Sequence, residues 1–93
     1  MILYKNEYYN FIQSRGVGSR DRVASSRDSY ISYLNTVSKL IGKDITPAVL
    51  SSEDDILRIE RMIEGQRSRK TIGNFKSAMR QYVAMINSED LRK

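Results

Sequence analysis

The sequence lacks cysteine and histidine altogether and has a single proline. Without cysteine the chain can form neither a disulfide nor a thiolate zinc site, and without histidine it lacks the commonest metal ligand and general base. No stretch approaches the roughly 20 apolar residues that cross a bilayer, and the N-terminus has no signal-peptide pattern. These absences exclude most catalytic and metal-binding constellations. We therefore expect no catalytic residue, no metal, no cofactor, no small-molecule substrate and a cytoplasmic location.

Negative charge is missing from a long stretch near the C-terminal end. No acidic residue occurs between Glu64 and Glu89, where five cationic residues stand: Arg67, Arg69, Lys70, Lys76 and Arg80. The formal net charge of the chain is +5, so the rest of the sequence is electrically balanced. A basic stretch of this kind favours a polyanionic partner. Nucleic acid is favoured over membrane because no segment predicts a helix with an exposed, bulky apolar face.

Apolar residues recur at helical spacing along the chain. Steps of three and four predict helices at about residues 2–14, 26–41, 53–63 and 69–87. There is no strand-like alternation and no internal repeat, and 93 residues make one small domain with one modest core. The sequence therefore predicts a single all-α domain, a bundle of four principal helices.

Each predicted helix carries one apolar stripe that is expected to face the core. Burial of these stripes against one another would account for most of the stability of so small a domain. The stripes consist of Tyr4, Tyr8, Phe11 and Ile12 in the first helix; Tyr30, Leu34, Val37 and Ile41 in the second; Ile56, Ile59, Met62 and Ile63 in the third; and Ile72, Phe75, Met79, Tyr82, Val83 and Ile86 in the fourth.

Helix ends are also marked in the sequence. Gly42 is expected to end the second helix in the left-handed conformation that glycine adopts at low cost. Ser52 is expected to cap the third helix, with Asp55 completing a capping box. Ser68 or Thr71 is expected to cap the fourth helix.

The last predicted helix has a second face, which is polar and basic. Because glycine costs about 1 kcal/mol of helix propensity relative to alanine, Gly73 on this face indicates close approach of another backbone, either DNA or a neighbouring helix. The head of Arg80 is expected to be free for a phosphate or to pair with Glu60 or Glu64. One row of this face holds Arg69, Gly73, Lys76 and Arg80, and the adjoining row holds Lys70, Asn74, Ser77 and Gln81.

Together these features resemble the core-binding domain of tyrosine recombinases and phage integrases. That family has a Ser or Thr, a Tyr and a Leu in an early helix, an Ile-Thr connector, and later an S-x-x-T-I-x-N motif followed by S-A-hydrophobic-R and an aromatic residue. The resemblance covers nearly the whole chain. The matching positions are Ser26, Tyr30, Leu34, Ile45, Thr46, Ser68, Thr71, Ile72, Asn74, Ser77, Ala78, Met79, Arg80 and Tyr82.

The resemblance implies a SAM-like orthogonal bundle that arches over one side of duplex DNA, with the last helix and the loop before it facing the phosphates. A complete recombinase continues into a catalytic domain, whereas this chain ends at Lys93. We therefore expect a non-catalytic module for DNA integration or recombination, working with further copies on the DNA or with a separate catalytic domain. Similar helical domains also precede nuclease domains in restriction-type proteins, so the parent system stays open between a recombinase and a nuclease. The expected DNA-binding residues are Arg67, Ser68, Arg69, Lys70, Thr71, Asn74, Lys76 and Arg80.

Several alternatives remain open from the sequence. The basic face is also suited to docking on an acidic protein, as in an assembly module or a small inhibitor. A second basic cluster, with Arg20, Arg22 and Arg27, is either a phosphate clamp or a loop without that role. Asn74 and Gln81 are the amides suited to reading a base edge. Tyrosines at core spacing are expected to be buried rather than to stack on bases.

Overall fold

The computed structural model describes the backbone of residues 1–15 and 27–89, and the side chains of residues 1–13 and 28–89. These residues form four helices and no β-strand: α1 (Lys5–Arg15), α2 (Arg27–Ile41), α3 (Glu53–Ile63) and α4 (Arg69–Ser88). The all-α prediction is therefore confirmed. Arg20, Arg22 and the side chain of Arg27 lie outside the described residues. None of the described helices is long and apolar enough to span a membrane.

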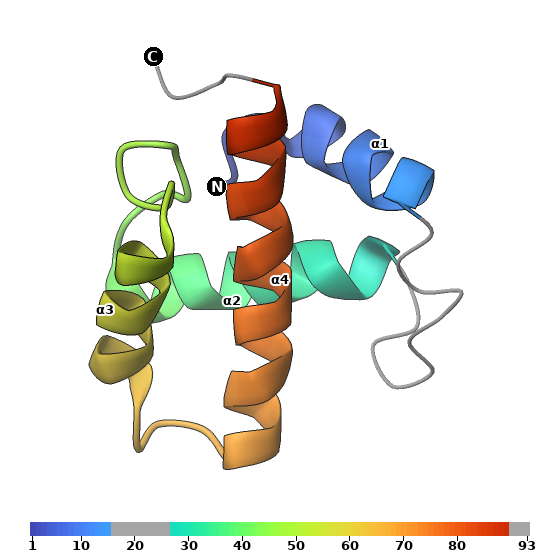
Figure 1. Ribbon diagram of the computed structural model, residues 1–93. Coiled ribbons are helices and arrows are strands. Elements are labelled where there is room, and N and C mark those ends of the chain that lie inside the picture. The colour runs from blue at the N-terminus through green and yellow to red at the C-terminus, as the bar shows by residue number, and fades with distance from the viewer. Residues whose placement is uncertain (16–26, 90–93) are drawn as a thin grey trace.

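The longest helix, α4, stands at the centre of the molecule and contacts each of the other three (Figure 1). α3 lies along one side of α4 and runs in the opposite direction, α1 lies on the other side, and α2 crosses behind them. This arrangement leaves the N-terminal end of α4 at one extremity of the bundle, next to the turn that leads out of α3. That end is the part of α4 that the other helices cover least.

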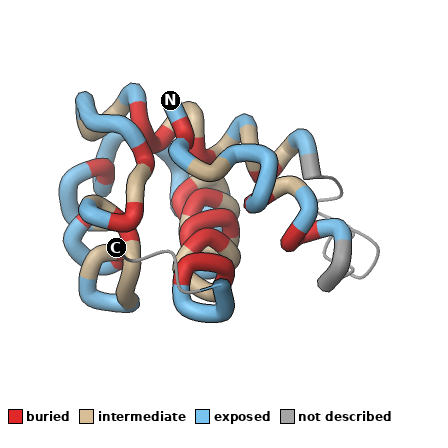
Figure 2. Tube along the Cα trace, turned by 90° about the horizontal axis from the view of Figure 1, so that it is seen from above, coloured by how far each residue is buried: buried red, intermediate tan, exposed pale blue. Residues whose placement is uncertain are grey.

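The apolar stripe predicted for the last helix is the inner face of α4. Ile72, Phe75, Met79, Tyr82 and Ile86 are all buried, while Val83 is half-buried at the margin. Figure 2 looks along α4 and shows these buried residues repeating on successive turns. Each large apolar side chain buried in this way contributes roughly 1.5 to 3 kcal/mol. Packing of this one face therefore holds the bundle together.

The first helix begins later than predicted. Residues 2–4 are not helical: Ile2 forms a parallel bridge with Ile45, the Leu3 N–H donates to the Ile45 carbonyl at 2.8 Å, and Tyr4 has φ 62°. The predicted start at residue 2 is therefore wrong. Extended pairing with the α2–α3 connector satisfies the backbone groups of these residues, and the left-handed Tyr4 then turns the chain into α1.

Two buried tyrosine hydroxyls join segments far apart in the chain. Tyr8 of α1 donates to the Ala78 carbonyl of α4 at 2.8 Å, and Tyr82 of α4 donates to the Leu3 carbonyl at 2.8 Å. Their rings pack against each other with centroids 5.7 Å apart. These tyrosines are core residues, as the spacing predicted, and the two carbonyls give their buried hydroxyls the hydrogen-bond partners that buried polar groups need.

Helix ends in the second half of the chain follow the predicted signals. Gly42 has φ 71° and its N–H donates to the Ser38 carbonyl, which ends α2. Ser52 caps α3 by accepting from the Asp55 N–H at 3.3 Å. The return bond of the capping box differs from the expectation, because the Asp55 carboxylate accepts from the N–H of Ser51.

One apolar residue of α3 is not in the core. Met62 was expected to be buried with Ile59 and Ile63, but its exposed fraction is 48%. With about 3.6 residues per turn, Met62 projects to the side of the stripe formed by Ile56, Ile59 and Ile63. Leu57, also on α3, is 43% exposed. The outer side of α3 is thus partly apolar.

The tyrosine contacts predict a loss of stability at alkaline pH. Burial, and then neighbouring groups that carry negative charge, raise the pKa of Tyr8 and Tyr82 above their ordinary value of 10.0. The folded state therefore holds protons that the unfolded chain releases above about pH 10, so stability is complete below that pH and falls above it. We expect urea denaturation to give a lower free energy of unfolding at about pH 11 than at about pH 9. The fall should be smaller in Tyr82→Phe, and an unchanged fall would contradict the role of Tyr82.

Candidate nucleic-acid interface

A short ordered turn places the N-terminal end of α4. α3 ends at Ile63, Gly65 takes the left-handed conformation with φ 89°, and the Gln66 N–H donates to the Ile63 carbonyl at 3.0 Å. Ser68 then caps α4 by accepting from the Thr71 N–H at 3.3 Å. We call residues 67–71 the basic end of α4. It consists of Arg67, Ser68, Arg69, Lys70 and Thr71.

The basic end carries positive charge that no acid balances. Arg69 and Lys70 are exposed, and neither forms an ion pair with a residue that the structure describes. The first turn of α4 contains no acidic residue, whereas the first turn of α3 contains Glu53, Asp54 and Asp55. Because a helix N-terminus already bears partial positive charge, cations placed there repel it. This arrangement costs stability, and a helix N-terminus of this charge favours an anion.

The two hydroxyls expected to meet phosphate are already engaged with each other. The Ser68 hydroxyl donates to Thr71 Oγ1 at 3.0 Å and accepts from the Thr71 N–H. Thr71 is half-buried and Ser68 is exposed. The hydroxyl proton of Thr71 remains available as a donor, since its oxygen only accepts in this pair.

Lys76 and Arg80 lie in a different environment from the basic end. Lys76 Nζ is 3.3 Å from Glu60 Oε1, and Arg80 Nε is 3.9 Å from Glu53 Oε2, both on α3. Arg80 was expected to be free or to pair with Glu60 or Glu64, so its pairing with Glu53 corrects that expectation. The reason is that α3 runs antiparallel beside α4, so its first turn lies level with Arg80. The basic face is therefore divided into a free end and a part neutralised by α3.

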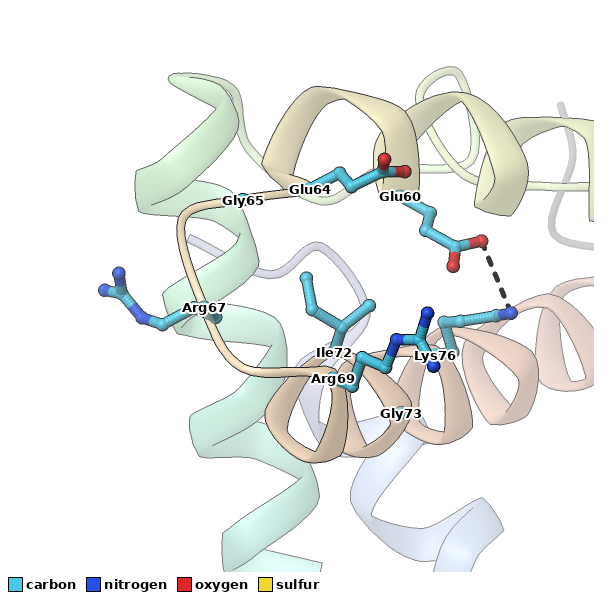
Figure 3. Close-up of a pocket in the computed structure, with 8 residues that line it drawn as sticks. All are labelled: Glu60, Glu64, Gly65, Arg67, Arg69, Ile72, Gly73 and Lys76. Carbon is cyan, nitrogen blue, oxygen red and sulfur yellow. Dashed lines mark ion pairs between the residues drawn. The ribbon is translucent and has the colours of Figure 1, made fainter.

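A cavity of about 500 Å³ lies between the end of α3 and the first two turns of α4. Figure 3 shows Glu60 and Glu64 on its α3 side and Lys76 on its α4 side, with Arg69 lying along α4 toward Lys76. The side chain of Arg67 points away from the cavity, and its Nη1 donates to the Gln66 carbonyl at 2.7 Å. Inside the cavity Lys76 pairs with Glu60, and Arg69 lies across from Glu64 without forming an ion pair with it. The cations of the basic end therefore form no ion pair with the described acids, although Glu64 lies nearby.

The polar row on the far side of α4 is only partly accessible. Asn74 is half-buried, one turn beyond Lys70 on the same side of the helix. Gln81 is also half-buried, and its Oε1 is buried with no hydrogen-bond partner among the described residues. Both amides were expected to suit hydrogen bonding to a base edge. Asn74 remains a candidate for that role, whereas the buried Oε1 of Gln81 is not accessible to a base.

Gly73 lies on the exposed side of α4, and apart from its chain neighbours and the adjacent backbone of α4 no described atom is within 4 Å of the position that a Cβ would occupy. Helix packing, one of the two explanations offered for this glycine, is therefore wrong. The side of α4 beside the basic end is open at Gly73. It would let another molecule approach the helix backbone closely.

The sequence analysis missed two parts of the pairing between α4 and α3: that Lys76 pairs with Glu60, and that the partner of Arg80 is Glu53. Glu53 and Glu60 are seven residues apart on one side of α3, and Lys76 and Arg80 are four apart on α4. Such matched stripes on consecutive helices joined by a short turn are a signal for antiparallel ion pairs. The sequence analysis weighed such a pair for Arg80 alone, and it left Lys76 on a free basic face because the register between the two helices was not known.

No family model, curated protein or solved structure matches this chain. Within residues 1–13 and 28–89, no three acidic side chains come together as they would to hold a metal ion. The functional argument therefore depends on the geometry and charge of the chain's own residues.

The open surroundings of Gly73 predict a stabilising substitution. Gly73→Ala should raise the free energy of unfolding by about 0.5 to 1 kcal/mol, because alanine loses less backbone entropy in a helix and meets no neighbour. Urea denaturation measures the change. A destabilised Gly73→Ala protein would show that a methyl group at this position meets a neighbour, and would contradict the open surroundings.

Proposed function

We propose that this chain is a non-catalytic DNA-binding module that contacts duplex phosphates through the basic end of α4. The cations of that end are Arg67, Arg69 and Lys70, and Ser68 and Thr71 lie between them. We further propose that it is a SAM-like domain of the kind that tyrosine recombinases and phage integrases use to hold DNA. The S-x-x-T cap at the start of α4 and the central place of that helix in an all-α bundle support this kinship.

The observation that carries the proposal is the unbalanced charge at a helix N-terminus. In an isolated domain, Arg69 and Lys70 repel the helix dipole, and acidic residues there would be more favourable by about 0.3 to 1 kcal/mol each. A phosphate placed at this end would interact favourably with both the dipole and the cations. The cations at this helix end therefore lower the stability of the isolated domain, and they would favour binding of a phosphate.

The geometry also limits how many phosphates are contacted. Lys76 and Arg80 are engaged by Glu60 and Glu53, so Arg67, Arg69 and Lys70 are the cations free to displace counterions. Three phosphate contacts would give a slope of about −2.7 in the logarithm of affinity against the logarithm of salt. Asn74 lies one turn after Lys70 on the same side of α4 and is the candidate for contact with a base edge. Because Gly73 has no side chain, DNA could approach the helix backbone closely there.

Charge reversal at the basic end should abolish binding without unfolding the protein. We expect Arg67→Glu/Arg69→Glu/Lys70→Glu to lose affinity for random duplex DNA in fluorescence anisotropy at low salt. The same variant should be as stable as wild type or more stable in urea, because acids suit a helix N-terminus. Loss of binding together with equal or higher stability would separate function from folding.

A control with the same change of charge tests whether position matters. The control variant Lys5→Glu/Lys39→Glu/Lys43→Glu reverses the charge of three exposed lysines that lie away from α4. Like the basic-end variant it has three charge reversals of −2 each, so both lower the formal net charge by the same amount from +5. We expect this control to keep most of its affinity. Equal losses in the two variants, or no binding by wild type even at low salt, would overturn the proposal. The latter result would favour an acidic protein as the partner of the basic end.

The acids of α3 should limit DNA affinity. Glu53→Gln/Glu60→Gln releases Arg80 and Lys76, and we expect tighter binding with a salt slope steeper by up to about 1.8. Glu7→Gln/Glu89→Gln removes the same charge at two exposed positions elsewhere. Anisotropy titrations at several salt concentrations would compare the two. The same gain in both variants would mean that net charge alone is responsible.

A further inference from the structure

The outer side of α3 is a surface that the proposed DNA contact does not use. Leu57 and Met62 are 43% and 48% exposed there, although both are large apolar residues. Together with Asp54, Arg58 and Arg61 they line a hollow of about 540 Å³. α3 thus has three sides: one buried in the core, one whose acids pair with α4, and this outer side.

The charges on the outer side are ordered along the helix. Asp54 lies near its start and Arg61 near its end, seven residues apart and therefore on one face, with Leu57 between them. Neither Asp54 nor Arg61 forms an ion pair with a described residue, and two turns of helix separate them too widely to pair with each other. Arg58 is different, because its Nη2 is held 2.6 Å from Asp55 Oδ1.

We propose that the outer side of α3 binds the same side of a second copy of this chain, with the two helices antiparallel across a two-fold axis. An axis between Leu57 and Arg58 would place Asp54 of each copy opposite Arg61 of the other. The two Leu57 side chains would meet near the axis, covered by the aliphatic stems of the Arg58 side chains. A two-fold contact of this kind requires a self-complementary surface, and the acid–apolar–base order supplies one.

A second copy fits this surface better than a partner of uniform charge. A uniformly acidic partner would be repelled by Asp54, and a uniformly basic partner would be repelled by Arg58 and Arg61. The face is short, since α3 has 11 residues, so the dimer should be weak and form over the range of about 1 μM to about 1 mM. The proposed contact is centred on Leu57 and Arg58 in the middle of α3, whereas the basic end begins beyond the turn that follows α3 (Figure 1).

A charge-swap series read by analytical ultracentrifugation tests the pairing. Wild type should show reversible dimerisation as its concentration rises to about 1 mM. Asp54→Arg brings two arginines face to face across the axis, and Arg61→Asp brings two aspartates face to face, so each variant alone should dimerise at least tenfold more weakly. An equimolar mixture of the two should recover dimerisation, because the unlike chains are again complementary. Far-UV circular dichroism confirms that each variant is folded before mixing.

Matched controls carry the same charge changes elsewhere. Glu7→Arg on α1 and Lys39→Asp on α2 alter exposed residues and should leave dimerisation unchanged. A wild-type protein that stays monomeric up to about 1 mM would overturn the proposal. So would a dimer that both single variants keep, or a mixture that fails to recover it while both chains are folded. The dimerisation results do not depend on whether the proposed DNA binding is correct. DNA binding is measured on dilute protein, at which the weak dimer would be dissociated.

Discussion

Burial of the apolar side of α4 is the constraint on which the rest of the structure depends. α1, α2 and α3 each pack on this helix, and the Tyr8 and Tyr82 hydroxyls bond to carbonyls across it. Once that side is buried, the orientation of every other α4 side chain is fixed by the helical repeat. The position of the basic residues is therefore a consequence of core packing. The proposed binding surface therefore lies on a packed helix, and a site that positions phosphates needs such a rigid support.

The same packing decides which cations are free. α3 and α4 are joined by a short turn and run antiparallel, so the acids of α3 pair with Lys76 and Arg80, and the described residues form no ion pair at the start of α4. Ion pairs of this kind contribute little to stability when exposed. Their larger effect is on the electrostatic surface, since they confine unbalanced positive charge to one end of the bundle. A charge count along the sequence shows how many cations exist, and the fold shows which of them can meet a partner.

Local signals in the sequence predicted the helices well. The stripe from Ile72 to Ile86, the cap at Ser68 and the end of α2 at Gly42 depend on neighbours within a few residues, and all three are confirmed. The start of α1 was wrong because Ile2 pairs with Ile45, a contact 43 residues away that no local pattern shows. The partner of Arg80 was wrong for the same reason. The exposure of Gly73 could be decided only once its neighbours in space were known.

The most direct test of the account is an NMR titration of the isotopically labelled domain with a random DNA duplex. Phosphate binding at the basic end predicts that the largest amide shift changes fall on residues 67–74, with smaller changes at Lys76 and Arg80 and little change on the outer side of α3. Such a pattern would place the contact on the one helix end whose charge the fold leaves unbalanced. Changes centred on α3 or α1, or no change at low salt, would contradict the account.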